Sequence, residues 1–164
     1  MMSASSLLIV EAFLPGYQAL RDAIATIAPR WTCEHANSAE IAVERLLSGQ
    51  SLPTAVICDL ALEDIPGEDF YASLSQHGPQ GIRWILISDD LLRLQRLKLG
   101  PDAICLPKPL ARAGFCKLAA TLVRYLDQGT RLVPTIAPDE AGVASSFSRR
   151  VSGNWQVQRA RRRA

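Results

Sequence analysis

The segment AVICDLALEDIPGEDF, residues 55–70, joins a strongly apolar run to an acidic loop. Its first residues, Ala55 to Cys58, are too few for a helix, and their continuous apolarity predicts a strand that is covered on both faces. The run ends on Asp59, and four further carboxylates follow before Phe70. A carboxylate at the end of a buried strand needs a partner for its charge, and the chain is expected to supply one elsewhere.

Short apolar runs of the same kind alternate with amphipathic segments over residues 1–128. The other runs are Leu7–Val10, Trp84–Ile87 and Ala103–Leu106, with a weaker one at Thr32–Ala36. Helical spacing of apolar residues predicts helices at 17–27, 41–47, 68–75, 90–99 and 115–126, and Asn37 with Glu40 predicts a capping box before the second. This alternation predicts an α/β fold with a doubly wound, five-stranded parallel sheet and helices on both faces.

The net charge of +2 is the sum of two regions of opposite sign. Residues 1–128 hold 11 basic and 14 acidic side chains, whereas residues 129–164 hold seven arginines against Asp139 and Glu140. The composition therefore predicts one globular domain over 1–128 and a basic, disordered C-terminal tail over 129–164. The alternative interpretation of this Arg-rich tail is a nucleic-acid-binding arm, with Trp155 available for stacking.

Several classes of protein are excluded by what the chain lacks. No apolar run approaches the length of a membrane span, and no basic residue precedes Arg21, so neither a membrane segment nor a signal peptide is expected. The four cysteines form no C-x-x-C pair, which predicts reduced thiols in a cytoplasmic protein and no zinc site. These cysteines are Cys33, Cys58, Cys105 and Cys116.

Four polar residues of different chemistry stand at the ends of the predicted strands. Glu11 ends the first, Asp59 the third and Ser88 the fourth, and Lys108 follows the fifth. Because ligands of doubly wound sheets bind beyond the carboxyl ends of the strands, these residues are predicted to form one site. The alternative, purely structural interpretation makes Asp59 a turn cap and Lys108 its ion-pair partner.

Three motifs contain these residues. Residues 57–67 read ICDLALEDIPG, residues 86–90 read LISDD and residues 106–110 read LPKPL. On these motifs, residues 6–127 resemble the receiver domain of two-component response regulators. The resemblance implies the strand order 2-1-3-4-5 and makes Asp59 the phosphoacceptor of a histidine kinase or phosphotransfer protein. It also implies that Ser88 and Lys108 stabilise the phosphoryl group, and that the peptide bond before Pro109 is often cis.

The resemblance also implies a magnesium ion held by Glu11, Asp59 and the backbone carbonyl of Ala61. The family has a second acid directly after the first strand, where this chain has Ala12, so magnesium binding is expected to be weak. The family's switch pairs a hydroxyl residue with an aromatic residue, and these positions correspond to Ser88 and Cys105.

Two functions follow from these observations. The first is a receiver module that accepts a phosphoryl group and signals through protein contacts, and it is no enzyme beyond its own phosphorylation and dephosphorylation. The alternative is a pseudo-receiver, which mediates protein contacts without phosphate because Ala12 weakens magnesium binding. A flavodoxin is excluded because EAFLPG, residues 11–16, is not a hydroxyl-rich phosphate loop. Either function is compatible with a monomer and with a homodimer.

Overall fold

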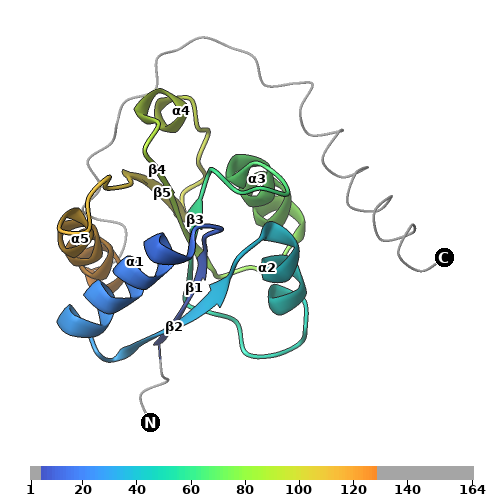
Figure 1. Cartoon of the computed structure of the whole chain (residues 1–164). Coiled ribbons are helices and arrows are strands. Elements are labelled where there is room, and N and C mark those ends of the chain that lie inside the picture. Colours follow the sequence, from blue (N-terminus) through green and yellow to red (C-terminus); the bar gives the residue numbers. More distant parts are fainter. Residues whose placement is uncertain (1–4, 129–164) are drawn as a thin grey trace.

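The computed structural model describes residues 5–128, which form a layered α/β fold (Figure 1). Five parallel strands make one sheet in the order β2-β1-β3-β4-β5. The strands are β1 (Ser5–Val10), β2 (Trp31–Ala36), β3 (Ala55–Asp59), β4 (Arg83–Ser88) and β5 (Ala103–Pro107). The predicted fold class and strand order are confirmed. The tail predicted for residues 129–164, with its alternative role in binding nucleic acid, lies outside the described residues.

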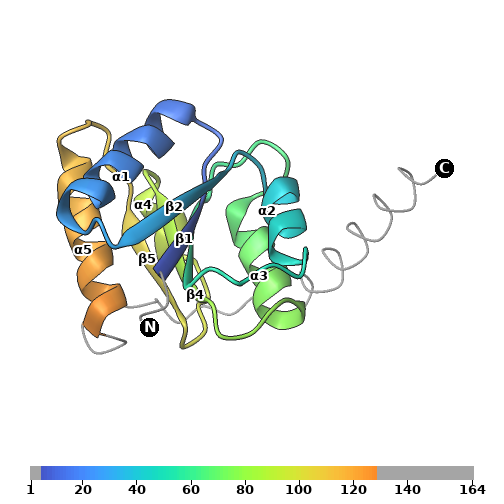
Figure 2. The same cartoon turned by 90° about the horizontal axis from the view of Figure 1, so that it is seen from below.

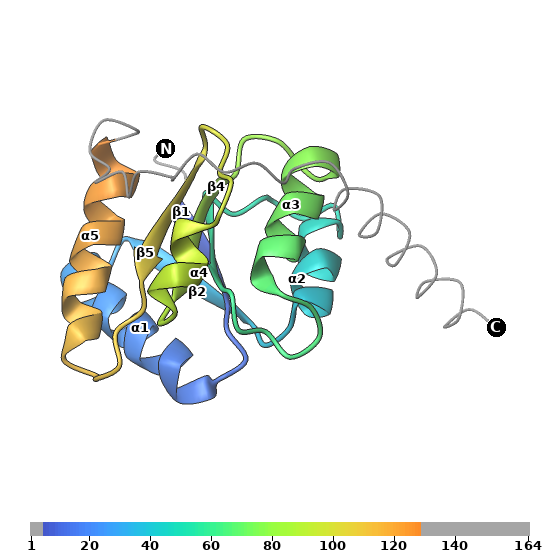
Figure 3. The ribbon, with the colours of Figure 1, turned by 90° about the horizontal axis from the view of Figure 1, so that it is seen from above.

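Helices cover both faces of the sheet, as the strand pattern requires. They are α1 (Leu14–Ile27), α2 (Ala39–Leu46), α3 (Gly67–His77), α4 (Leu91–Gln95) and α5 (Gly114–Gln128). Helices α1 and α5 lie on one face, and α2 and α3 on the other, as Figures 2 and 3 show from opposite directions. Within residues 5–128, none of the helices has the length and apolarity that a bilayer crossing requires.

The core consists of two apolar clusters, one on each face of the sheet. The cluster beneath α1 and α5 includes Ile9, Ile57, Ile85, Leu20 and Leu122. The cluster beneath α2, α3 and α4 includes Leu8, Val56, Leu86, Phe70 and Leu94. Because side chains alternate between the faces along each strand, both clusters draw on β1, β3 and β4. The central strands are therefore rigidly packed, and the residues at their carboxyl ends have fixed positions.

The start of α2 differs from the prediction. Ser38, rather than Asn37, caps this helix, and its hydroxyl oxygen accepts a backbone N–H bond of 3.2 Å. The carboxylate of Asp64 accepts the N–H groups of Ala39 and Glu40 at 3.2 and 2.9 Å. The predicted capping box of Asn37 and Glu40 is therefore wrong, because Ser38 is the N-cap, and Asp64 from the loop after β3 accepts two further N–H groups.

Helix α4 is much shorter than the predicted helix over 90–99. It ends at Gln95; Arg96 lies in a turn, and residues 97–100 are neither helix nor strand. Leu97 and Leu99 are partly buried against the cluster beneath α2, α3 and α4. Packing of these two leucines in a non-helical segment explains why their helix-like spacing was misleading.

Candidate functional site

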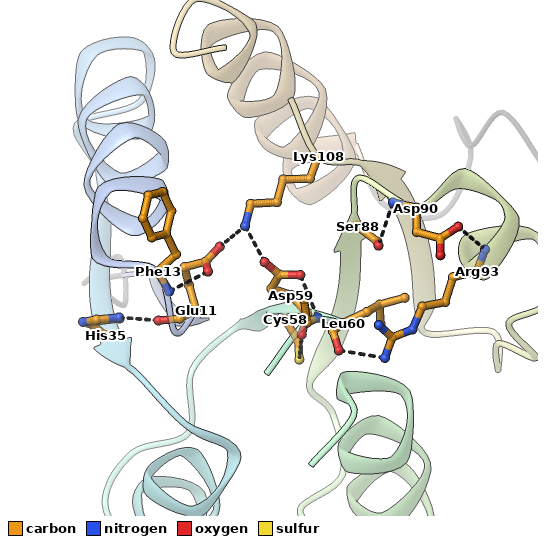
Figure 4. Close-up of polar contacts among 11 residues, drawn as sticks. Glu11, Phe13, His35, Cys58, Asp59, Leu60, Ser88, Asp90, Arg93 and Lys108 are labelled. Carbon is orange, nitrogen blue, oxygen red and sulfur yellow. Dashed lines mark hydrogen bonds and ion pairs between the residues drawn. The ribbon is translucent and has the colours of Figure 1, made fainter. Parts of the chain in front are cut away.

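The site lies at the carboxyl edge of the sheet, where a polar residue ends or directly follows each of four strands (Figure 4). Asp59 is the last residue of β3 and Ser88 the last of β4, while Glu11 and Lys108 directly follow β1 and β5. Glu11 and Asp59 are each 3% exposed and Ser88 is 1% exposed. Polar groups buried to this degree need hydrogen-bond partners, and the structure supplies them.

Lys108 connects the two carboxylates directly. Its ammonium donates to Glu11 Oε2 at 2.6 Å and also donates to Asp59 Oδ2. These contacts join β1, β3 and the segment after β5 (Figure 4). We call Glu11, Asp59 and Lys108 the Lys108 triad. The structure thus brings three of the four predicted site residues into contact.

Backbone groups hold the remaining oxygens of the two carboxylates. The N–H of Ala61 donates to Asp59 Oδ1 at 2.9 Å, and the N–H of Phe13 donates to Glu11 Oε1 at 2.9 Å. His35 Nε2 lies 2.9 Å from the carbonyl oxygen of Glu11, which holds the backbone at this position as well. Both carboxylates therefore have a fixed orientation before any ligand binds.

Burial and the hydrogen bonds within the triad have opposite effects on the pKa values of Glu11 and Lys108. Burial raises the pKa of Glu11, although bonds from Lys108 and the Phe13 N–H lower it in part. For Lys108, burial lowers the pKa, but the bonds and charges of Asp59 and Glu11 outweigh it and raise the pKa overall. The lysine therefore stays cationic at neutral pH, and one positive charge faces two buried acids.

Ser88 lies beside the triad but makes different contacts. Its hydroxyl oxygen accepts the N–H of Asp90 at 3.0 Å, and its carbonyl accepts the N–H of Lys108 at 2.8 Å. Its neighbour Ile87 pairs with Asp59 across the sheet. Within residues 5–128, no hydrogen bond joins the Ser88 hydroxyl to the triad. Ser88 is therefore adjacent to Asp59, with its hydroxyl engaged at the start of α4.

Two further positions that the sequence singled out are Ala12, where the family has an acid, and Cys105, the second switch position. Ala12 follows Glu11 and adds no side-chain oxygen to the site. Cys105 is partly buried on β5, and its sulfur lies 4.0 Å from the carbonyl oxygen of Leu94 in α4. Burial raises the pKa of the Cys105 thiol. This cysteine is therefore a small, protonated side chain packed against α4.

Proline follows Lys108 in the site loop. The peptide bond between Lys108 and Pro109 is trans, since no bond in the described part of the chain is cis. The cis form that the resemblance often implies is therefore not present in this structure.

Gly67 allows the loop after Asp59 to pack tightly. A Cβ atom at Gly67 would lie 2.4 Å from the Asp59 carbonyl oxygen and 2.7 Å from the Leu60 Cα, both closer than packing permits. The N–H of Gly67 also donates to the Leu60 carbonyl at 3.0 Å. The start of α3 is thus in contact with the backbone that carries Asp59.

Arg93 is a polar residue at this edge that the sequence did not predict. Its guanidinium donates to the Leu60 carbonyl at 2.9 Å and to both carboxylate oxygens of Glu68. The signal in the sequence was weak, since charged residues on a predicted surface helix are normally solvated. We call Ser88, Asp90 and Arg93 the α4 network, because Asp90 also caps α4 through the N–H of Arg93 at 3.0 Å.

The residues of the site meet the minimum requirement for magnesium. Mg²⁺ is commonly bound by one or two carboxylates, with waters and phosphate oxygens completing its coordination. Glu11 and Asp59 supply two carboxylates, and no group of three or more acidic, histidine or cysteine side chains within 5–128 is arranged to hold a metal. Glu11 and Asp59 are therefore the side chains that could hold the ion, and both are bonded to Lys108.

Comparisons with known proteins establish the fold through solved structures. No family model matches the chain. No curated protein matches it either. A search of solved structures, in contrast, finds many receiver domains that superpose on most of it.

The phosphorylated cyanobacterial phytochrome response regulator RcpA has a TM-score of 0.64 at 15% identity, over 81% of this chain and 100% of its own. The response regulator domain of Thermotoga maritima CheB has a TM-score of 0.60 at 17% identity, over 80% of this chain and 100% of its own. T. maritima TrrA, in complex with Mg²⁺ and BeF, has a TM-score of 0.59 at 18% identity, over 74% of this chain and 98% of its own. The chain therefore has the receiver fold, and this fold alone does not determine its activity.

Proposed function

We propose that this chain is the receiver module of a two-component phosphorelay and accepts a phosphoryl group on Asp59. The observation that carries the proposal is the position of the Asp59 carboxylate, which is bonded to the Lys108 ammonium and the Ala61 N–H at the end of β3. A carboxylate oriented in this way is a suitable nucleophile, since phosphoryl transfer depends mainly on positioning and charge neutralisation. The donor class is the phosphohistidine of a histidine kinase or phosphotransfer protein.

The proposed reaction exchanges one bond to phosphorus for another. An oxygen of Asp59 bonds to phosphorus while the phosphorus–nitrogen bond of the donor breaks. The donor imidazole leaves with the electron pair of that bond and takes up one hydrogen ion from the buffered solvent. The products are an acyl phosphate on Asp59 and a neutral histidine. Lys108 stabilises the charge on the phosphoryl oxygens, and the Ser88 hydroxyl donates its proton to one of them while its oxygen accepts the Asp90 N–H.

Magnesium would be held by Glu11, Asp59 and the Ala61 carbonyl. When bound, it supplies positive charge that offsets the charge of the phosphoryl group. Glu11 would be its carboxylate ligand after β1, since Ala12 has no side-chain oxygen. The bonds of Lys108 to both carboxylates lower their availability, which accounts for the weak affinity we expect.

The second candidate is a pseudo-receiver that works without phosphate. The observation that favours it is the same ion-pair arrangement, because Lys108 already neutralises part of the charge of Glu11 and Asp59. Ala12 leaves the site without the second acid that would compete with the lysine for a metal. In this case the fold serves as a surface for protein contacts, and the triad is structural.

Phosphorylation by a small-molecule donor distinguishes the two candidates. The wild type and Asp59→Asn are incubated with acetyl phosphate and Mg²⁺, and intact mass is followed over time. The proposal predicts a labile gain of one phosphate in the wild type and none in Asp59→Asn. The absence of any gain in the wild type, with saturating donor and magnesium, would establish the pseudo-receiver instead.

Ala12→Asp is the companion variant, because it restores the acid that the resemblance implies. We expect faster labelling and a lower magnesium requirement than in the wild type. Ala120→Asp is its matched control, since it adds the same charge to an exposed position of α5, which contributes no group to the site. An equal gain from both variants would show that general charge, rather than a restored ligand, is responsible.

For either candidate, we propose a cytoplasmic protein whose output passes through contacts with other proteins. A homodimer is one such contact. The Arg-rich residues 129–164 are the segment through which nucleic acid would be bound, and this role predicts a strongly salt-dependent affinity that is lost on truncation after Gln128.

A further inference from the structure

Helix α4 is attached to the loop that carries the acceptor by the side chain of Arg93 (Figure 4). The guanidinium Nη2 donates to the Leu60 carbonyl at 2.9 Å and to Glu68 Oε2 at 2.7 Å, and Nε donates to Glu68 Oε1 at 2.8 Å. The pairing with Glu68 uses two parallel bonds, which fixes the plane of the guanidinium as well as its position. A single side chain of α4 thus reaches both the loop after β3 and the start of α3.

The Leu60 carbonyl that Arg93 binds is covalently linked to the N–H group that holds Asp59. It belongs to the same planar peptide unit as the N–H of Ala61, and in a trans peptide these two groups point in opposite directions. The N–H of Ala61 is the donor to Asp59 Oδ1 at 2.9 Å. Arg93 therefore holds one end of a rigid unit whose other end holds the acceptor carboxylate.

The neighbouring bonds leave this unit little other support. Gly67 shares the Leu60 carbonyl as an acceptor, at 3.0 Å, and the N–H of Leu60 donates to the Ile87 carbonyl at 3.0 Å. The second of these bonds holds the preceding peptide and not the one that contains the Ala61 N–H. Rotation of the Leu60–Ala61 peptide is thus limited by two donors, Gly67 and Arg93.

The N-terminal end of α4 is linked to the site through Ser88. The hydroxyl of Ser88 accepts the Asp90 N–H, and the carboxylate of Asp90 accepts the Arg93 N–H, each at 3.0 Å. Helix α4 itself contributes only Leu94 as a buried residue, while Leu91 and Leu92 are exposed. With so little apolar burial, the position of α4 depends on these polar links.

We infer that Arg93 is a positioning residue for Asp59, and that it couples the position of α4 to the orientation of the acceptor carboxylate. Displacement of α4 withdraws the guanidinium from Leu60, and the Ala61 N–H then loses its fixed direction toward Asp59. Because coupling is reciprocal, a change at Asp59 alters the stability of α4 to the same extent. The role in signalling rests on the proposed function, whereas the positioning itself does not.

The test compares Arg93→Gln with Arg45→Gln by amide hydrogen exchange. Arg45 is a matched control, because it also makes two bonds to a glutamate, Glu34 at 2.5 and 2.8 Å, and one to a backbone carbonyl. We expect Arg93→Gln to accelerate exchange of the Ala61 and Gly67 amides about tenfold, the usual effect of losing a charged hydrogen bond. Arg45→Gln should leave both rates within about twofold of the wild type.

Two additional measurements separate positioning from general loss of stability. Exchange of the Ile57 amide in β3 reports global opening, and it should change much less than that of Ala61 in Arg93→Gln. Arg93→Lys keeps the charge with a single donor group and should restore part of the protection. Unchanged Ala61 exchange in Arg93→Gln, or equal acceleration of Ala61 and Ile57, would overturn the inference.

Phosphorylation provides the last readout and keeps the two proposals distinct. If the wild type is labelled by acetyl phosphate, Arg93→Gln should be labelled about tenfold more slowly and Arg45→Gln at the wild-type rate. If the wild type is not labelled, the proposed function fails, but the exchange experiment still decides whether Arg93 positions the Asp59 loop.

Discussion

The Lys108 triad and the α4 network flank the same residue, Asp59, but they are built from different interactions. The triad joins charged side chains from distant parts of the sequence, and its members are largely buried. The network consists mainly of hydrogen bonds between side chains and backbone groups, and it connects the five-residue helix α4 to Ser88 and to the Leu60 carbonyl. The triad therefore determines the charge at the site, whereas the network determines the geometry of the loop, and separate substitutions should affect each.

Removal of Lys108 should have the largest effect. Lys108→Met leaves Glu11 and Asp59 as two buried acids without their cation, and we expect a loss of about 3 kcal/mol in the free energy of unfolding, measured by urea denaturation. The exposed Lys98 is the matched control, and Lys98→Met should change stability by less than about 0.5 kcal/mol. Addition of Glu11→Gln to Lys108→Met should recover part of the loss. Equal stabilities of the two lysine variants would show that the triad is not a coupled unit.

Crowding at the start of α3 should be the next largest effect. In Gly67→Ala, the added methyl meets the backbone of Asp59 and Leu60, and we expect a loss of about 2 kcal/mol together with slower labelling of Asp59. Gly100→Ala is the control, because its Cβ would be 3.4 Å from the Tyr71 hydroxyl, at the edge of ordinary contact. A labelling rate in Gly67→Ala equal to that of the wild type would mean that the loop adapts without moving the acceptor.

The hydroxyl of Ser88 should contribute less to stability and more to function. Ser88→Ala removes the acceptor of the Asp90 N–H and should cost about 1 kcal/mol. Ser38→Ala removes the cap of α2 and should cost a similar amount, about 1 kcal/mol. Only Ser88→Ala should slow labelling of Asp59 by acetyl phosphate. A similar decrease in both variants would assign the effect to stability rather than to the site.

The smallest expected effect is the pH dependence that Glu11 contributes. Its pKa in the folded protein is raised above the ordinary value of 4.5, so the folded state binds this proton more tightly than the unfolded state does. The resulting stabilisation is fully present below pH 4.5 and is lost as the pH rises through the folded pKa. The stability of the wild type relative to Glu11→Gln should therefore decline with rising pH over that interval, measured by urea denaturation at several pH values. A relative stability that rises over this interval would contradict the effect of burial on Glu11.

Much of the fold could be predicted because its strands are covered on both faces. Continuous apolar runs such as Ala55–Cys58 have no polar alternation to confuse with a surface strand, and their order along the chain implies a parallel sheet. The meeting of Glu11, Asp59 and Lys108 followed from the same reasoning, since parallel strands end at one edge. The rest of the site depends on loops. Arg93 contacts Leu60 and Glu68 across a different loop, and the spacing of residues 90–99 carries no information about those partners.

The cap of α2 shows the same limit on a smaller scale. Asn37 and Ser38 are both good capping residues, and their neighbours in sequence do not distinguish them. The choice depends on Asp64, which reaches the first N–H groups of α2 from a different loop. Interactions between loops that are distant in sequence are therefore the part of this molecule that local patterns do not predict.

In the proposed function, the carboxylate of Asp59 is the group that receives phosphorus. The most direct measurement treats the wild type with acetyl phosphate and Mg²⁺, reduces the product with borohydride, and locates the modified residue by peptide mass spectrometry. Because borohydride converts an acyl phosphate to an alcohol, we expect homoserine at position 59 of the wild type and none in Asp59→Asn. Modification at another carboxylate, or none in the wild type, would show that Asp59 is not the phosphoacceptor.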